Sequence, residues 1–195
     1  MKRTAVNFVR LSEVSKKKAF LMTGASPLQK KSPVAAVLAY ALAQEGKRTL
    51  LIADSKDLQK WRLEQDQDYR ESLSTGDQFL GIQPAQPNLL SLGVTEPSGL
   101  ELYDRAKTVG FMENAKAHFD FVIVDSACLY SHPLPLFITT VVDGVILLVR
   151  LDTSKSSALF VKKKVEEAHG ELVGVIMSQM TCPIPPAIMR QWNLD

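Results

Sequence analysis

Short apolar runs recur along this chain, and within them polar residues do not alternate with apolar ones. An apolar run without alternation is typical of a strand that is covered on both faces, as in a parallel sheet between two layers of helices. The pattern therefore predicts an α/β fold with three layers, a mostly parallel, doubly wound sheet with helices on both faces. The predicted strands are 19–23, 49–53, 88–93, 121–124, 144–150 and 173–177.

The first fifty residues contain the clearest unit of this fold, a strand, a loop, a helix and a second strand. Ser32 is a good N-cap for the helix, Pro33 suits its first position, and Gly46 ends it. A βαβ unit of this kind places its two strands in parallel with a right-handed crossover. The four segments are 19–23, 24–31, 34–44 and 49–53.

Doubly wound folds bind their ligands beyond the carboxyl ends of the strands, so we expect a functional site there. Those ends carry the loop after Thr23, the residues after Ala53, and Asp125. We expect all three to converge on one edge of the sheet. Further helices, which complete the outer layers, are predicted at 57–71, 98–118 and 154–170.

The composition is that of a globular protein, because 46% of the residues are hydrophobic and 23% are charged. A net charge of +2 gives no reason to expect a nucleic-acid partner. Cys128 and Cys182 lie far apart, so we expect no disulfide framework, no metal site and a reducing, cytoplasmic compartment. No signal peptide or membrane span is predicted, so association with a membrane would need a partner protein.

The chain of 195 residues fits one domain, which we place at 19–182, between an N-terminal arm, 1–18, and a proline-rich C-terminal tail, 183–195. The arm carries scattered apolar residues, and two interpretations stay open. It either docks on another subunit or a membrane adaptor, or it packs on its own domain. The lysine runs 16–18 and 162–164 are typical of a solvated face, with contact to an acidic membrane surface or partner as the alternative.

The segment TGASPLQKKSP, Thr23–Pro33, with the helix and strand after it, resembles the Walker A region of the MinD/ParA-type P-loop ATPases. Within that class it is most similar to the bacterial tyrosine kinases of capsule and exopolysaccharide synthesis, the CpsD/CapB family. The stretch FDFVIVD, which ends at Asp125, resembles the Walker B strand of that family. The resemblance covers about 19–180 and implies a P-loop NTPase-like fold. Two further segments, VDGVILLVR, 142–150, and LVGVIMSQM, 172–180, resemble the last two core strands of that family.

The phosphate loop of this family typically runs Pro-Gly-Glu-Gly-Lys-Ser-Thr. This chain differs from it at the glycine and threonine positions, which lie against the phosphate in the family. The two family glycines fall on Leu28 and Lys30, and the first glycine of the wider pattern falls on Ala25. Glycine is needed where a residue adopts positive φ or where a Cβ would collide with the phosphate. The family threonine falls on Pro33, which has no N–H to donate. We therefore expect weak or absent nucleotide binding.

Other positions of the family site are retained. Lys31 and Ser32 stand at the lysine and magnesium-ligand positions, and Asp125 at that of the Walker B carboxylate. The resemblance implies that these three residues are the remnant of a nucleotide and magnesium site. The two aspartates that follow the second strand in the kinases fall on Ala53 and Ser55.

These changes together favour a catalytically degenerate protein, with no catalytic residue, no bound metal and no cofactor, that acts as a regulatory or interaction subunit. The resemblance places it in exopolysaccharide or capsule synthesis and export. It implies a protein partner, either a membrane regulator of polysaccharide chain length or an active kinase, through which the chain would reach the membrane. Homo-oligomerisation is left open.

Two alternatives come from the same resemblance. The chain is either a divergent but active ATPase or protein-tyrosine kinase, which would use ATP and magnesium and need Lys31, Ser32 and Asp125, or a ParA/MinD-like positioning factor. The signature lysine of the positioning factors falls on Ser26, which speaks against the second alternative.

Overall fold

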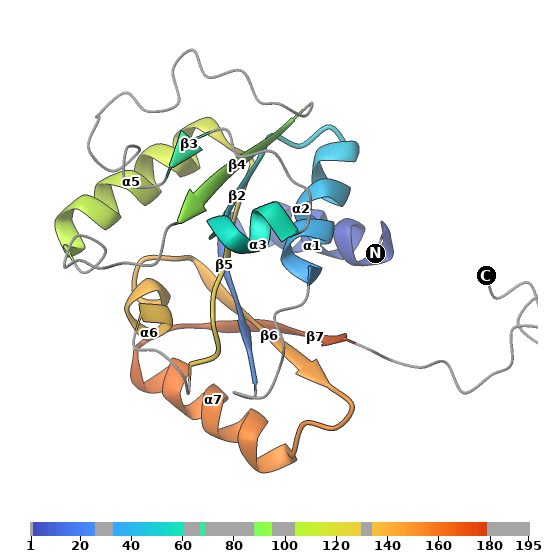
Figure 1. The fold of residues 1–195 in the computed structure, drawn as a ribbon, viewed down its shortest axis with the longest axis vertical. Coiled ribbons are helices and arrows are strands. Elements are labelled where there is room, and N and C mark those ends of the chain that lie inside the picture. The colour runs from blue at the N-terminus through green and yellow to red at the C-terminus, as the bar shows by residue number, and fades with distance from the viewer. Residues whose placement is uncertain are drawn as a thin grey trace, which may run out of the picture.

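Seven strands form one sheet in the computed structural model, which describes residues 2–25, 33–60, 67–68, 88–94, 104–129 and 134–178 (Figure 1). The strand order is β3-β4-β2-β5-β1-β6-β7, and each neighbouring pair is parallel. The predicted parallel sheet is therefore confirmed. Its strands are β1 (Ala19–Gly24), β2 (Thr49–Asp54), β3 (Gln67–Asp68), β4 (Leu89–Val94), β5 (Phe121–Asp125), β6 (Gly144–Arg150) and β7 (Leu172–Ser178).

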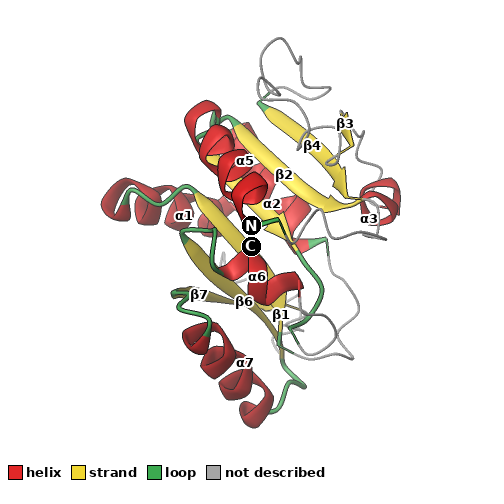
Figure 2. Ribbon diagram, turned by 90° about the vertical axis from the view of Figure 1, so that its left-hand side faces the viewer, coloured by secondary structure: helices red, strands yellow, loops and turns green. Residues whose placement is uncertain are grey.

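Helices cover both faces of this sheet, as predicted (Figure 2). Alternate residues of β1 show the two layers, since Phe20 packs with Leu38 of α2 on one face and Leu21 packs with Met112 of α5 on the other. The face of Phe20 is covered by α1, α2 and α3, and the face of Leu21 by α5, α6 and α7. Their bounds are α1 (Lys2–Ser15), α2 (Val34–Gln44), α3 (Ser55–Lys60), α5 (Arg105–His118), α6 (Leu134–Thr139) and α7 (Lys155–Glu167).

The helix after the first strand, α2, spans the predicted residues, but its first turn differs. The carbonyl of Pro33 accepts the N–H of Val37 at 2.8 Å, so Pro33 is the N-cap and not the first helical residue. Ser32, the predicted N-cap, lies outside the described residues. Gly46 ends the helix as predicted, with φ of +77°.

Two predicted helices were placed wrongly. The helix predicted at 57–71 ends at Lys60, and Gln67–Asp68 forms β3 instead, since its backbone pairs with β4. The helix predicted at 98–118 begins at Arg105, because Asp104 has extended backbone and its carboxylate accepts the N–H groups of Ala106 and Lys107.

The N-terminal arm packs on its own domain. Its helix, α1, places the ring of Phe8 edge-on to the ring of Phe20, with 5.0 Å between the centroids, and Phe8 is buried. The lysine run that follows is also engaged, because Lys17 pairs with Glu171 and the N–H of Lys18 bonds Asp143. These contacts favour the second of the two interpretations of the arm.

The other lysine run lies on α7 and is balanced within that helix. Lys162 pairs with Glu166, and both Lys163 and Lys164 pair with Glu167. These are exposed pairs one helical turn apart, as on a solvated helix face.

We expect Ser154→Ala to lower the free energy of unfolding by about 1 kcal/mol, the usual contribution of an N-cap. The Oγ of Ser154 accepts the N–H of Ser157 at 3.1 Å at the start of α7. Urea unfolding followed by circular dichroism measures the change. Ser156→Ala is the matched control, because the Ser156 hydroxyl contacts Ser154 Oγ and does not cap the helix. Equal losses in the two variants would contradict the capping role.

Candidate functional site

The carboxyl ends of β1, β2 and β5 lie at one edge of the sheet, where the candidate site was predicted. β5 lies between the other two strands, and its last residue, Asp125, is in register with Met22 of β1. The segment that joins β1 to α2 leaves from this same edge. Lys31 and Ser32 belong to that segment and lie outside the described residues, so the structure places Asp125 alone of the three predicted site residues.

The chain after β5 folds back against the end of β1. The hydroxyl of Thr23, which is fully buried, donates to the carbonyl of Ala127 at 2.9 Å. The N–H of Ser126 donates to the carbonyl of Met22 at 3.0 Å, and its hydroxyl also points to these carbonyls. Both hydroxyls therefore stabilise the junction between the two strands.

Ala25 takes the position of the first glycine of the phosphate-loop pattern. Its N–H donates to the carbonyl of Leu148 in β6 at 3.0 Å, and its methyl group is buried in the core on the α5 side of the sheet. This amide continues the hydrogen bonding of the sheet. The Ala25 N–H therefore donates to a backbone carbonyl and not into the phosphate-loop position.

The start of α2 is apolar and has a proline at its cap. Pro33 offers no N–H, and no side-chain hydrogen bond caps the helix there. The first three helical residues, Val34, Ala35 and Ala36, pack in the core beside α1. In a phosphate loop this helix end supplies inward-facing amides and the positive end of the helix dipole. Here the cap residue, Pro33, has no N–H to supply.

The carboxylates at this edge have different surroundings. Asp54 accepts the N–H of Lys56 at 2.8 Å and so caps the first turn after β2. Ala53, where the resemblance would require the first kinase aspartate, is buried. At the end of β6, the guanidinium of Arg150 forms a fork with Asp152, which holds the pKa of that carboxyl below its ordinary value.

Among the described residues, Asp125 alone represents the predicted magnesium and nucleotide site. Asp125 has the position of a Walker B carboxylate, but no cluster of three acidic, histidine or cysteine ligands forms in the described ranges. The two aspartates that follow the second strand in the kinases are replaced here by Ala53 and Ser55. Asp125 could hold a hydrated cation if a phosphate were present, and the described part of the edge adds no further ligand at the kinase positions.

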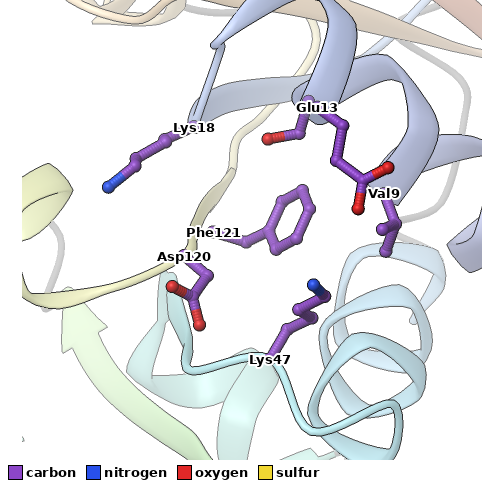
Figure 3. A pocket seen from close by; sticks show the side chains of 7 residues that line it. Val9, Glu13, Lys18, Lys47, Asp120 and Phe121 are labelled. Atoms are coloured by element: carbon purple, nitrogen blue, oxygen red, sulfur yellow. The ribbon is translucent and has the colours of Figure 1, made fainter.

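Sequence reasoning missed a pocket at the opposite edge, under α1 (Figure 3). It measures about 180 Å³, and Figure 3 shows the Phe121 ring in its middle with charged side chains around it. Its residues come from four separate segments without a motif, so no sequence signal could identify it. The lining residues are Val9, Ser12, Glu13, Lys18, Lys47, Asp120 and Phe121.

Two of the charged side chains of this pocket, Lys18 and Asp120, have partners within the fold. Lys18 Nζ donates to the carbonyl of Lys116 at 2.8 Å. Burial would raise the pKa of Asp120, but the backbone N–H and the guanidinium of Arg48 outweigh it and lower that pKa. The pocket lies beside the first residues of β5, whereas Asp125 is the last residue of that strand. It is therefore separate from the predicted site.

No protein-family model and no curated protein matches the sequence. Several solved structures match the fold. The chimerical protein CapA2B2 is 20% identical, with 89% of this chain and 81% of that one covered at a TM-score of 0.74. The kinase domain of Escherichia coli tyrosine kinase ETK is 20% identical, with 94% and 76% covered at 0.71. A chain of the MinC:MinD cell division protein complex of Aquifex aeolicus is 16% identical, with 90% of this chain and 72% of that one covered at a TM-score of 0.69.

These likenesses confirm the fold that the sequence resemblance implies, the P-loop NTPase-like fold of bacterial tyrosine-kinase domains and of ParA and MinD ATPases. At sequence identities of 16–20% these matches show the fold and do not show the activity, which depends on the residues of the site. Among the helices of the described ranges, none is sufficiently long and apolar to cross a membrane.

Proposed function

We propose that this protein is a catalytically degenerate P-loop protein of the tyrosine-kinase and ParA-like type, which acts as a regulatory or interaction subunit. The observation that carries the proposal is Pro33 at the N-cap of α2. A phosphate loop binds through successive backbone N–H groups at this helix end. An imino acid there removes one donor without disturbing the fold around it.

The losses at the loop add up. A charge-assisted hydrogen bond contributes about 1.5–3 kcal/mol, so losing two of them weakens binding by about a hundredfold or more. Pro33 accounts for one lost donor, and Leu28 and Lys30 add bulk where the family has glycine. The commitment of the Ala25 N–H to Leu148 supports the same conclusion.

The proposed pathway is exopolysaccharide or capsule synthesis and export, as the sequence resemblance to the CpsD/CapB tyrosine kinases implies, and the likeness in fold to the kinase domain of ETK agrees with that class of protein. The proposed partner is a membrane regulator of chain length or an active kinase of that pathway. A fold of this type can work through a protein partner, since a MinC:MinD complex is among the structures that match. Through such a partner the chain would be held at the cytoplasmic face of the membrane.

The second candidate is a divergent active ATPase or tyrosine kinase. It is favoured by Asp125, which stands at the end of β5 beside β1, where a Walker B carboxylate belongs. In that case Lys31 and Ser32 would bind the phosphates and magnesium, as the family positions imply.

Isothermal titration with ATP and magnesium separates the two candidates. We expect no binding in the micromolar range and no ATP hydrolysis, and we expect Lys31→Ala to behave as the wild type because the lysine has no bound phosphate to contact. The active alternative predicts a measurable ATPase rate that Lys31→Ala abolishes. Micromolar binding together with turnover in the wild type would overturn the proposal.

A further inference from the structure

β7 carries apolar side chains that the described helices leave uncovered. Leu147 of β6 and Val175 of β7 are in register and point to the same face of the sheet. Leu147 is 2% exposed, whereas Val175, one strand further out, is 55% exposed. Met177, in register with Val149, is 50% exposed. The cover on this face therefore stops between β6 and β7.

The helix above this face explains where the cover stops. α7 buries Val161 and Val165 completely, and these side chains belong to the same core cluster as Val145 and Leu147 of β6. We call Val175 and Met177 the β7 strip. In the part of the sheet that the structure describes, β7 has a neighbouring strand on one side only, so the strip borders an open edge. An apolar strip beside an open edge favours association with further chain.

We propose that the β7 strip is the docking surface for the chain's own C-terminal tail, residues 183–195. The tail follows the last residue of β7, Ser178, after a link of only four residues, 179–182. It has two charged residues of opposite sign, Arg190 and Asp195, so its burial needs little desolvation of charge. Its large apolar residues are Ile184, Ile188, Met189, Trp192 and Leu194.

The tail is a better occupant than a second copy of the chain. Covalent attachment beside the strip gives the tail a high effective concentration, in the millimolar range for short linkers. A second copy must lose translational and rotational freedom to reach the same strip. Extended chain covers about 3.3 Å per residue, so 17 residues from 179 to 195 can turn and run back along the strand.

Trp192 reports directly on this docking. The chain has two tryptophans, so Trp61→Phe leaves Trp192 as the single indole fluorophore. In the full-length Trp61→Phe protein we expect blue-shifted emission and weak quenching by acrylamide. Adding Val175→Asp and Met177→Asp should shift the emission to the red and raise the quenching constant severalfold, because charged side chains remove the apolar surface.

Val14→Asp is the matched control, since Val14 is an exposed valine on α1 in another part of the molecule, and it should leave the Trp192 signal unchanged. Circular dichroism and thermal melts establish that each variant is folded. Solvent-exposed Trp192 in the parent protein, or a signal that the β7 substitutions leave unchanged, would overturn the proposal. Protection that is lost on dilution would also overturn it, in favour of a second copy on the strip.

Discussion

The triple substitution Leu28→Gly, Lys30→Gly and Pro33→Thr is expected to raise the affinity for ATP and magnesium by about a hundredfold or more. It returns both family glycines and one backbone N–H to the loop before α2. The structure makes the change tolerable at Pro33, because this residue caps α2 without any side-chain hydrogen bond. Titration calorimetry on the wild type and the variant measures the gain.

Two controls identify the cause of the gain. Gln29→Glu introduces the family residue at a loop position that supplies neither a glycine nor a new N–H, so it should give no gain in affinity. Lys31→Ala in the restored loop should remove most of the gain, because the ammonium group then has a phosphate to contact. A restored variant that is folded but binds no better than the wild type would refute the argument that these residues limit binding.

The sheet was predictable because its signal is local. A strand buried on both faces must be apolar throughout, and Phe121–Val124 and Gly144–Arg150 both meet that condition. The helix α2 was predictable for a similar reason, since Gly46 at its end has the positive φ that few other residues adopt readily. Successive side chains of a strand point to opposite faces of the sheet, so each apolar strand packs against both layers of helices.

Elements that depend on distant partners were not predictable. The two residues of β3 form a strand only because β4 lies beside them, and their own sequence is polar. The short helix α6 has six residues with Pro135 near its start, which is too little for a periodic pattern. Tertiary context decided both cases.

The candidate site was predictable in position but not in its contacts. The sequence predicted that Asp125 lies at the edge formed by the carboxyl ends of the strands, and the structure places it at that edge beside β1. The bond from the Thr23 hydroxyl to Ala127 joins residues 104 positions apart, and the bond from Ala25 to Leu148 spans a similar length of chain. No sequence motif encodes such pairs. Only the structure shows that polar groups at this edge are hydrogen-bonded to backbone carbonyls of neighbouring segments.

Asp143→Ala is expected to lower the free energy of unfolding by about 2–4 kcal/mol, because two backbone donors lose their acceptor. Asp143 Oδ2 accepts the N–H groups of Lys18 and Ala19, each at 2.9 Å, and Oδ1 contacts Lys116 Nζ at 3.2 Å. Ala19 is fully buried, so water cannot replace the lost bond there. One carboxylate thus joins the start of β1 to the turn before β6 and to α5. Denaturant unfolding at neutral pH measures the loss.

The pH dependence of that loss identifies the charge of the carboxylate as its cause. Burial would raise the pKa of Asp143, but the N–H groups of Ala19 and Lys18 and the charge of Lys116 outweigh it and lower that pKa below its ordinary value. A lowered folded-state pKa stabilises the fold fully above the pKa of the unfolded aspartate, near 4, and this stabilisation is lost as the pH falls through the folded value. The difference between wild type and Asp143→Ala should therefore be constant near neutral pH and shrink below about pH 4.

Asp143→Asn and Asp152→Ala complete this test. The asparagine keeps one oxygen acceptor without the charge, so its stability should lie between that of the wild type and that of Asp143→Ala, with little dependence on acid pH. Asp152 pairs with Arg150 in an exposed fork, and such pairs contribute little to folding, so Asp152→Ala should leave stability almost unchanged. If Asp143→Ala were as stable as Asp152→Ala, the carboxylate could not be what holds β1 to β6, and the stability of that junction would have to come from strand packing alone.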